Sequence, residues 1–342
     1  MNFKEIIRET FCQDQWKYYP NNWQFKNLNI ENPDDCRKFI RLFFDDSGKA
    51  GAASAILYGL KKIKSLSNER CQHIVCVFLL GVGIYDKVAE IKTRIDEQIQ
   101  QYIEQYGCKS DVNFYFIWFL CCLFHDLGYV KEESEKLVEG IDFQVGQTLV
   151  GVPNVFSRRT IKNYWSFRQK SHGKNDHGIY AGITMYKSLC EIRSVQEKDS
   201  WENEKLSWEK ELEKIYNVAS WIVLCHNIWF GHKQKICECE IYKEFNLEKL
   251  LLDEGEYKIK LNNHPLFFFF CLIDTIEPIK KVKDSLLLKQ IDIFFGNNEM
   301  IITSNLKCGC GDHYLDSVSG LNDWLTKTER KDNKVTIKLN LK

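Results

Sequence analysis

The run FYFIWFLCCLFHDLG, covering Phe114–Gly128, is the sharpest local feature of this chain. It is apolar as far as Phe124 and then places His125 and Asp126 side by side. Its apolar part is far shorter than the roughly 20 residues that a helix needs to cross a bilayer. The same is true of a second apolar run, Pro265–Ile273. We therefore predict that both runs are helices in the core of a globular domain, and we expect no membrane partner.

Most of the chain before residue 285 carries apolar residues at helical spacing, which predicts a mainly α-helical protein. Local start signals support several of these helices. Ser67 precedes Asn68 and Glu69, and Pro265 stands at the first position of its apolar run. Only 5 prolines occur, as expected for long helices joined by short loops. The predicted helices cover residues 33–45, 50–65, 69–84, 87–106, 112–127, 176–192, 199–230 and 264–277.

The sequence pattern changes after about residue 285. Residues 291–295, 299–303 and 334–339 read as short strands around turns. We therefore predict a helical domain over residues 1–285, with an N-terminal helical extension, and a small β-containing extension over residues 286–342. Residues 191–217 are dense in charge but repeat Trp and Leu at helical spacing, so we expect an insertion helix there with one solvated face.

The balance of charge excludes a strong electrostatic field around the whole molecule. Lys plus Arg and Asp plus Glu each number 47, so the formal net charge is zero. Such a protein is not drawn as a whole to nucleic acid or to anionic lipid. A local basic groove is still compatible with zero net charge. Hydrophobic residues make up 44% of the chain, enough for a core that closes without disulfides or a structural metal.

The 14 cysteines are interpreted as reduced packing residues of a cytoplasmic protein. The opening residues contain no apolar signal core, and the chain is not a small disulfide scaffold. Two pairs, Cys237 with Cys239 and Cys308 with Cys310, could form a zinc site together with His313. Each pair has one residue between its cysteines instead of the usual two, which favours free thiols.

His125 and Asp126 are the sharpest chemical signal in the sequence, because they end a strongly apolar helix. Burying an imidazole or a carboxylate is costly unless the group is paired or ligates a metal. One cation would satisfy both residues together. The adjacent pair therefore predicts a bound metal ion.

Four further residues with metal-ligating side chains lie in comparable apolar surroundings. A single core histidine is more often hydrogen-bonded to a backbone carbonyl than bound to a metal. An aspartate in the middle of an apolar helix is harder to explain that way, because Asp is almost never fully buried unpaired. With the His-Asp pair they form a set of four imidazoles and two carboxylates, which suits one or two divalent ions. These four residues are His73, His177, His226 and Asp274.

The order His, His-Asp, His, His and Asp on successive helices resembles the HD superfamily of metal-dependent phosphohydrolases, over roughly residues 65–282. The resemblance implies an HD-domain-like helical bundle. In that family the first His, the His-Asp pair and the last Asp hold one ion. The Asp of the pair bridges to a second ion, which two further histidines hold. Carried onto this chain, the first set is His73, His125, Asp126 and Asp274, and the second is Asp126, His177 and His226.

The second set of histidines resembles binuclear members of the family, which include HD-GYP phosphodiesterases, CRISPR-associated HD nucleases and HD diiron oxygenases. Asp176-His177-Gly178 with Gly182 is similar to the Asp-His-Ser and downstream Gly-Ala of the CRISPR nucleases, with Gly178 in place of Ser. We expect Asp176 to support the metal ligands from behind. Glu277 is assigned the same role, or that of a proton acceptor. An ordinary ion pair of Glu277 with Lys280 or Lys281 is the alternative.

One position departs from the family pattern. Many relatives continue His-Asp-x-Gly with a Lys that contacts the substrate, whereas this chain has Tyr129. His172 and Lys174, in the loop before His177, are therefore predicted to bind substrate, with a solvent-exposed role as the alternative. Arg70 and Lys131 are further sources of positive charge, and Lys131 reads as a surface residue.

The resemblance implies a phosphohydrolase that uses two divalent ions, with manganese, iron and magnesium as the leading candidates. The catalytic Asp126 would join the two ions, and a water activated by them would attack a phosphoryl group. The expected substrate is a small-molecule nucleotide or another phosphoester, with nucleic acid as a further candidate partner. An HD-type diiron oxygenase acting on a small organic substrate stays open, because its ligand set is the same.

Overall fold

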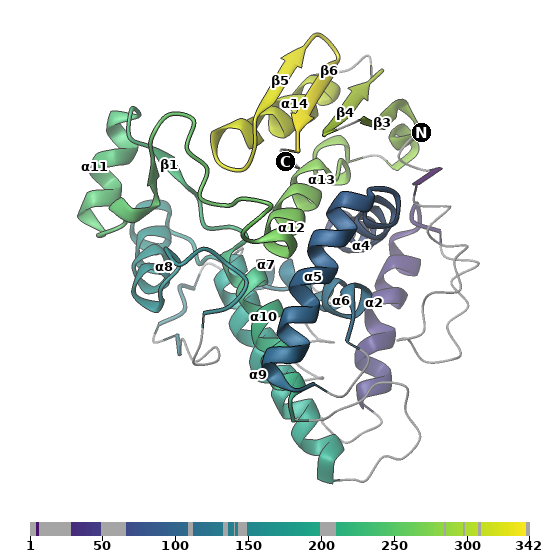
Figure 1. Cartoon of the computed structure of the whole chain (residues 1–342), viewed down its shortest axis with the longest axis vertical. Helices are drawn as coiled ribbons and strands as arrows, with labels where there is room; N and C mark the ends of the chain where they lie inside the picture. The colour runs from purple at the N-terminus through teal and green to yellow at the C-terminus, as the bar shows by residue number, and fades with distance from the viewer. Residues whose placement is uncertain are drawn as a thin grey trace.

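The computed structural model describes residues 5–6, 29–48, 66–108, 112–132, 136–139, 141–142, 149–198, 210–283, 285–296, 298–306 and 309–339. Over these residues the protein is mainly α-helical with a β-containing extension at the C-terminal end, which confirms the predicted fold class (Figure 1). The predicted helix at residues 50–65 lies outside the described residues. The same is true of residues 199–209 in the predicted insertion.

The predicted helices occur in the expected order within the described residues, but the helix predicted over residues 199–230 is helical there only over Leu212–Cys225. Side-chain caps mark several of the helix starts. The Ser67 side chain accepts a hydrogen bond from the Arg70 N–H, and Asn113 does the same for Phe116. The helices are α2 (Pro33–Gly48), α4 (Asn68–Lys87), α5 (Ala89–Tyr106), α6 (Phe114–His125), α7 (Tyr129–Glu132), α8 (Arg158–His172), α9 (His177–Lys198), α10 (Leu212–Cys225), α11 (Ile236–Glu244), α12 (Pro265–Ile276), α13 (Ile279–Val282) and α14 (Gly309–Ser319).

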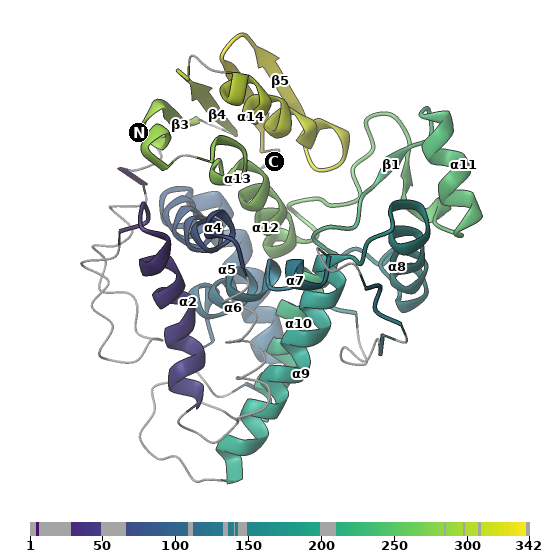
Figure 2. The same cartoon turned by 180° about the vertical axis from the view of Figure 1, so that it is seen from behind.

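Helix α6 lies at the centre of the bundle and contacts α4, α5, α9 and α10 (Figures 1 and 2). Of the described residues, Phe114–Glu132 alone is long and apolar enough to pass for a membrane-spanning helix, and 78% of its most apolar window is buried inside the protein. Burial of that kind is what a core helix shows. The two apolar runs of the sequence, now α6 and α12, are both core helices as predicted.

Two glycines let helices approach closely around α6. A Cβ atom at Gly81 of α4 would collide with the Trp118 ring of α6, and the Trp118 Nε1 donates to the Phe78 carbonyl at 3.0 Å. On α9, a Cβ atom at Gly182 would lie 2.5 Å from Leu224 Cβ on α10. The absence of a side chain at Gly81 therefore lets α4 pack closely on α6.

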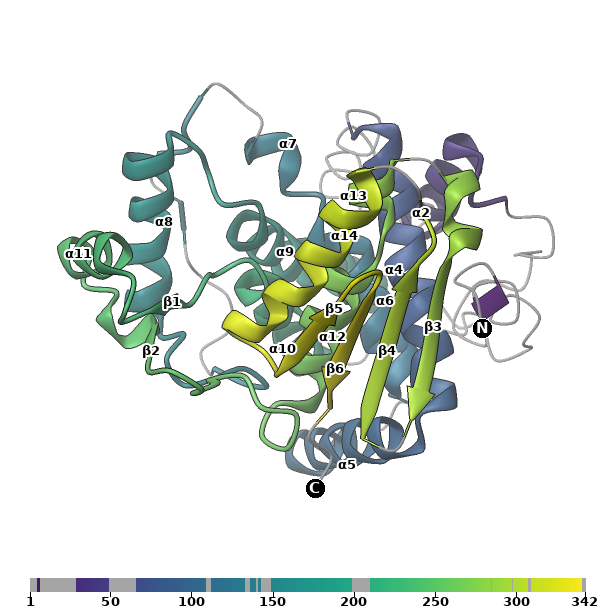
Figure 3. The ribbon, with the colours of Figure 1, turned by 90° about the horizontal axis from the view of Figure 1, so that it is seen from above.

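The C-terminal extension is an antiparallel sheet in the order β3-β4-β6-β5, built from β3 (Ile291–Gly296), β4 (Glu299–Ser304), β5 (Thr328–Lys331) and β6 (Lys334–Lys338) (Figure 3). Its buried positions alternate along the strands, with Met300 opposite Ile337 and Ile302 opposite Val335. Helix α14 packs against β5 and β6 on one side and against α12 and α13 on the other. The extension therefore lies behind the helix that carries Asp274.

Helices α8 and α11 lie on the side of α9 and α10 that is away from α2 and α4 (Figures 1 and 2). Helix α8 packs there on α11 through Phe167, whose ring centroid lies 5.3 Å from that of Tyr242. The short parallel strands β1 (Gly231–His232) and β2 (Leu251–Leu252) follow α10 and precede α12. The sequence pattern does not predict α8, α11, α14 or β5, although Ser157 and Gly173 cap α8 in the usual way.

The cysteines agree with the sequence interpretation at most described positions. Cys237 and Cys239 are thiols on α11. Cys310 is disulfide-bonded, so the expectation that every cysteine is reduced is wrong. A disulfide sulfur is no longer a thiolate, and Cys310 as it stands cannot be the zinc ligand considered above. Cys308 lies outside the described residues.

Candidate metal centre

The six predicted ligands come from five helices that surround one buried point. His73 lies in the second turn of α4, and His125 is the last residue of α6. His177 is the first residue of α9, and His226 follows the end of α10. All four histidines are buried, and Asp126 is fully buried. Asp274, on α12, is the exception, because 17% of its side chain is exposed.

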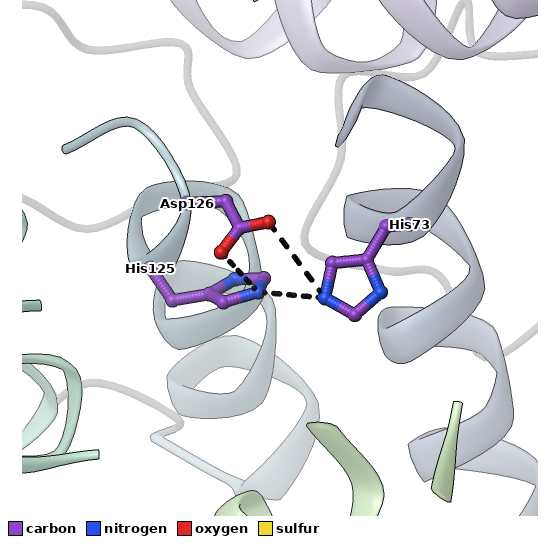
Figure 4. A group of neighbouring side chains, drawn as sticks. All are labelled: His73, His125 and Asp126. Carbon is purple, nitrogen blue, oxygen red and sulfur yellow. Dashed lines mark hydrogen bonds and ion pairs between the residues drawn. The ribbon is translucent and has the colours of Figure 1, made fainter. Parts of the chain in front are cut away.

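His73 is at the centre of the first group of ligands. Its Nε2 atom lies 3.2 Å from His125 Nε2, 2.9 Å from Asp274 Oδ1 and 3.8 Å from Asp126 Oδ2. His125 Nε2 is in turn 3.3 Å from Asp126 Oδ1 (Figure 4). Ligand atoms of His73, His125 and Asp126 all lie within 4.8 Å of one another. That spacing allows one ion to be held between them.

A second group of ligands shares Asp126 with the first. Ligand atoms of Asp126, His177 and His226 also lie within 4.8 Å of one another. The His125 and His226 rings meet edge to face with centroids 5.6 Å apart, and His177 and His226 do so at 5.2 Å. The structure therefore brings together all six residues that the sequence singled out, with Asp126 in both groups.

Each histidine uses its Nδ1 atom to contact a hydrogen-bond acceptor outside the centre. His125 Nδ1 lies 2.7 Å from the Cys122 carbonyl oxygen, and His226 Nδ1 lies 2.6 Å from that of Val223. The other two contact carboxylates: His73 Nδ1 is 2.5 Å from Glu277 Oε2, and His177 Nδ1 is 2.6 Å from Glu132 Oε2. Carbonyl and carboxylate oxygens only accept, so each Nδ1 carries a proton and Nε2 is the ring nitrogen that faces the centre.

Two buried atoms in this centre have no hydrogen-bond partner among the residues that the structure describes. They are Asp126 Oδ1 and His226 Nε2. Burial lowers the pKa of His226 to about 3, helped by the nearby His177, so its ring is neutral and Nε2 has a lone pair. Unsatisfied buried acceptors are costly. Because both belong to the predicted ligand set, the residues present fit a divalent metal ion.

Two cations balance the carboxylates of the centre. Lys280 Nζ lies 2.9 Å from Asp274 Oδ1 and 3.9 Å from Asp126 Oδ1. Arg70 Nη1 donates to Asp126 Oδ2 at 3.4 Å. Burial by itself would raise the pKa of Asp126, but His125, Lys280, His73 and Arg70 together hold it below its usual range. Asp126 is therefore ionised and ready to act as a ligand.

Tyr129, three residues after Asp126, lies between Arg70 and His177. Its ring stacks on His177 with centroids 3.8 Å apart, and the Arg70 guanidinium carbon lies 3.2 Å from the same ring's centroid. Two groups this close to one centroid must occupy opposite faces of the ring. Tyr129 therefore positions the guanidinium of Arg70 beside Asp126.

Glu132, Arg168 and Asn227 surround the second group, and no sequence pattern singled them out. Arg168 Nη2 donates to Glu132 Oε1 at 2.6 Å, and the other Glu132 oxygen contacts His177. Asn227 Nδ2 donates to Asp176 Oδ2 at 2.8 Å. Glu132 is an ordinary charged residue in the sequence, and only its contacts in the fold show its role.

The two residues expected to support the ligands both lie beside the centre. Glu277 contacts His73, and its other oxygen accepts from the Ile279 N–H at 2.9 Å. The ion pair of Lys280 is with Asp274. Asp176 Oδ1 accepts from the Ile179 N–H at 2.9 Å at the start of α9, so it orients the helix that begins with His177.

His172 and Lys174, the residues predicted to bind substrate, are exposed at the end of α8. The His172 ring lies edge-on to Trp229, with centroids 5.8 Å apart, and the Lys174 N–H donates to the Arg168 carbonyl at 3.3 Å. His172 therefore lies on the surface beside Trp229, and the backbone of Lys174 lies beside that of Arg168. Gly178 lies against the second group, since a Cβ atom there would be 3.0 Å from His226 Cε1.

No protein-family model matches the chain, and no curated protein or solved structure matches it either.

Proposed function

We propose that the protein is an HD-type metal-dependent phosphohydrolase that cleaves a phosphomonoester or phosphodiester. The observation that supports this best is that Asp126 belongs to two groups of ligand atoms, each within 4.8 Å. A carboxylate has two oxygens and can serve two ions at once, while each neighbouring imidazole offers one Nε2. His73, His125, Asp126 and Asp274 would hold one ion, and Asp126, His177 and His226 the other.

Bound manganese, iron or magnesium would supply Lewis acidity toward a phosphoryl oxygen and would lower the pKa of a water molecule toward neutrality. The side chains of the protein orient the residues that would hold the ions. Glu277 and Glu132 hold His73 and His177 in the tautomer that ligates through Nε2. No side-chain nucleophile is needed for this chemistry.

The charge around the opening of the centre favours an anionic substrate. Asp274 is 17% exposed, and the neighbouring side chains of Lys280 and Arg70 are 22% and 21% exposed, whereas Asp126 is fully buried. Solvent therefore reaches the centre beside two cations. A guanidinium and an ammonium at this place can bind phosphoryl oxygens, the role that Lys has in many relatives. This feature supports a phosphoester more than a neutral organic substrate.

Hydrolysis of bis(p-nitrophenyl) phosphate by the manganese-loaded protein tests the proposal. The rate should be the same with and without dioxygen, because hydrolysis consumes none. His125→Ala should lose the activity, which separates it from contaminating phosphatases. Panels of phosphomonoesters and nucleoside triphosphates extend the test. If every ester stays intact while the iron-loaded protein consumes dioxygen with a small organic substrate, the protein is an oxygenase and the proposal is wrong.

A further inference from the structure

Trp229 is an exposed aromatic ring close to the candidate metal centre. It follows His226 by three positions and is 45% exposed. Its backbone is held on both sides by buried tyrosines, because its N–H donates to Tyr164 Oη at 3.3 Å and its carbonyl accepts from Tyr242 Oη at 2.9 Å. The ring is therefore presented at the surface by a rigid part of the fold.

One contact under the ring links Trp229 to the second group of ligands. The guanidinium carbon of Arg168 lies 4.5 Å from the centroid of the Trp229 ring. Arg168 is only 4% exposed, and its Nη2 bonds Glu132, whose other oxygen holds His177. The ring thus lies two side chains away from a predicted metal ligand.

We propose that Trp229 stacks on a nucleobase of the substrate. This inference rests on the proposed function and names its substrate class. An indole ring offers a flat surface to any base, and base–aromatic stacking does not depend on base identity. His172 lies edge-on to the ring, and the exposed Lys174, two positions further along the chain, adds a positive charge to this part of the surface.

The test compares two esters with the same leaving group, thymidine 5′-(p-nitrophenyl phosphate) and methyl p-nitrophenyl phosphate, using the manganese-loaded protein. The wild type should prefer the ester that carries a base. Trp229→Ala should lower kcat/KM about tenfold for that ester, mainly through KM, and should leave the base-free ester unchanged. Trp229→Phe should restore most of the preference. Phe294→Ala, which removes a ring that is 46% exposed on β3, is the matched control.

A binding experiment without turnover separates this inference from the proposed function. In calcium, thymidine monophosphate should bind more tightly than deoxyribose 5-phosphate, and Trp229→Ala should remove the difference. Binding of hexathymidylate, measured in the same way, shows whether the surface takes a free nucleotide or single-stranded nucleic acid. If Trp229→Ala removes this difference in affinity while the wild type hydrolyses no ester, the stacking surface is supported and the phosphohydrolase proposal is wrong. Hydrolysis without any base preference, or equal losses on both esters in Trp229→Ala, overturns the stacking surface alone.

Discussion

Glu277 Oε2 lies 2.5 Å from Nδ1 of His73, although the two residues are separated by 204 positions in the sequence. In the same way, Glu132 Oε2 lies 2.6 Å from Nδ1 of His177. Each of the two proposed ion positions therefore includes one histidine oriented by a carboxylate. The remaining histidines, His125 and His226, are oriented by backbone carbonyls of their own helices.

Glu277→Ala should weaken binding of the first ion, whereas Glu132→Ala should weaken binding of the second. Loss of a carboxylate behind a metal-ligating imidazole typically costs about 10- to 100-fold in metal affinity. Competition with a chromogenic chelator measures both affinities. Glu277→Gln should lose less than Glu277→Ala, because its amide oxygen still accepts from His73. Equal effects of both alanine variants on both ions would contradict the assignment.

Gly128→Ala should selectively damage the second ion position. A Cβ atom at residue 128 would collide with the carbonyl of His177 and lie 2.9 Å from its Cα, so the start of α9 would have to move. The expected result is weaker binding of the second ion with the first retained, and a loss of about 1–3 kcal/mol in unfolding free energy. Chelator competition and urea unfolding measure these effects. Gly309→Ala is the control, since nothing lies within 4 Å of its Cβ position.

Lys280→Ala should destabilise the metal-free protein more than the metal-loaded one. Without metal, its ammonium is 2.9 Å from Asp274 Oδ1 and 3.9 Å from Asp126 Oδ1. Removing it should cost about 1–3 kcal/mol in EDTA, because two carboxylates lose a cation. Bound ions would supply the missing charge, so the loss should shrink in manganese. Lys233→Ala, at an exposed ion pair with Asp253, should behave alike in both conditions.

His264, which precedes the first residue of α12, should make the protein less stable in acid. Burial lowers its pKa in the folded state to about 4, against about 6.5 in the unfolded chain. Between these values the unfolded state binds the extra proton, so the unfolding free energy should fall as the pH is lowered. Urea unfolding at about pH 7 and about pH 5 tests this. His264→Gln should reduce the difference, and an unchanged difference would contradict the assignment.

The parts of the site that the sequence could predict are those with a strong contrast to their surroundings. His125, Asp126 and Asp274 stand out because they interrupt apolar runs that must be buried. Glu132 and Lys280 lie among other charged residues, so only the fold shows which carboxylate or ammonium reaches the centre. Helix α8 was missed because its apolar residues are few, even though Ser157 caps it.

The metal content of three proteins reconstituted with manganese tests the central claim, that Asp126 joins two ion positions, most directly. Elemental analysis should find two ions per wild-type chain, one in His226→Ala and none in Asp126→Ala, because only Asp126 belongs to both groups of ligands. Circular dichroism should show that each variant keeps its helices, since the apolar core greatly outweighs one ion in stability. One ion or fewer in the wild type, or equal losses in both variants, would contradict the account.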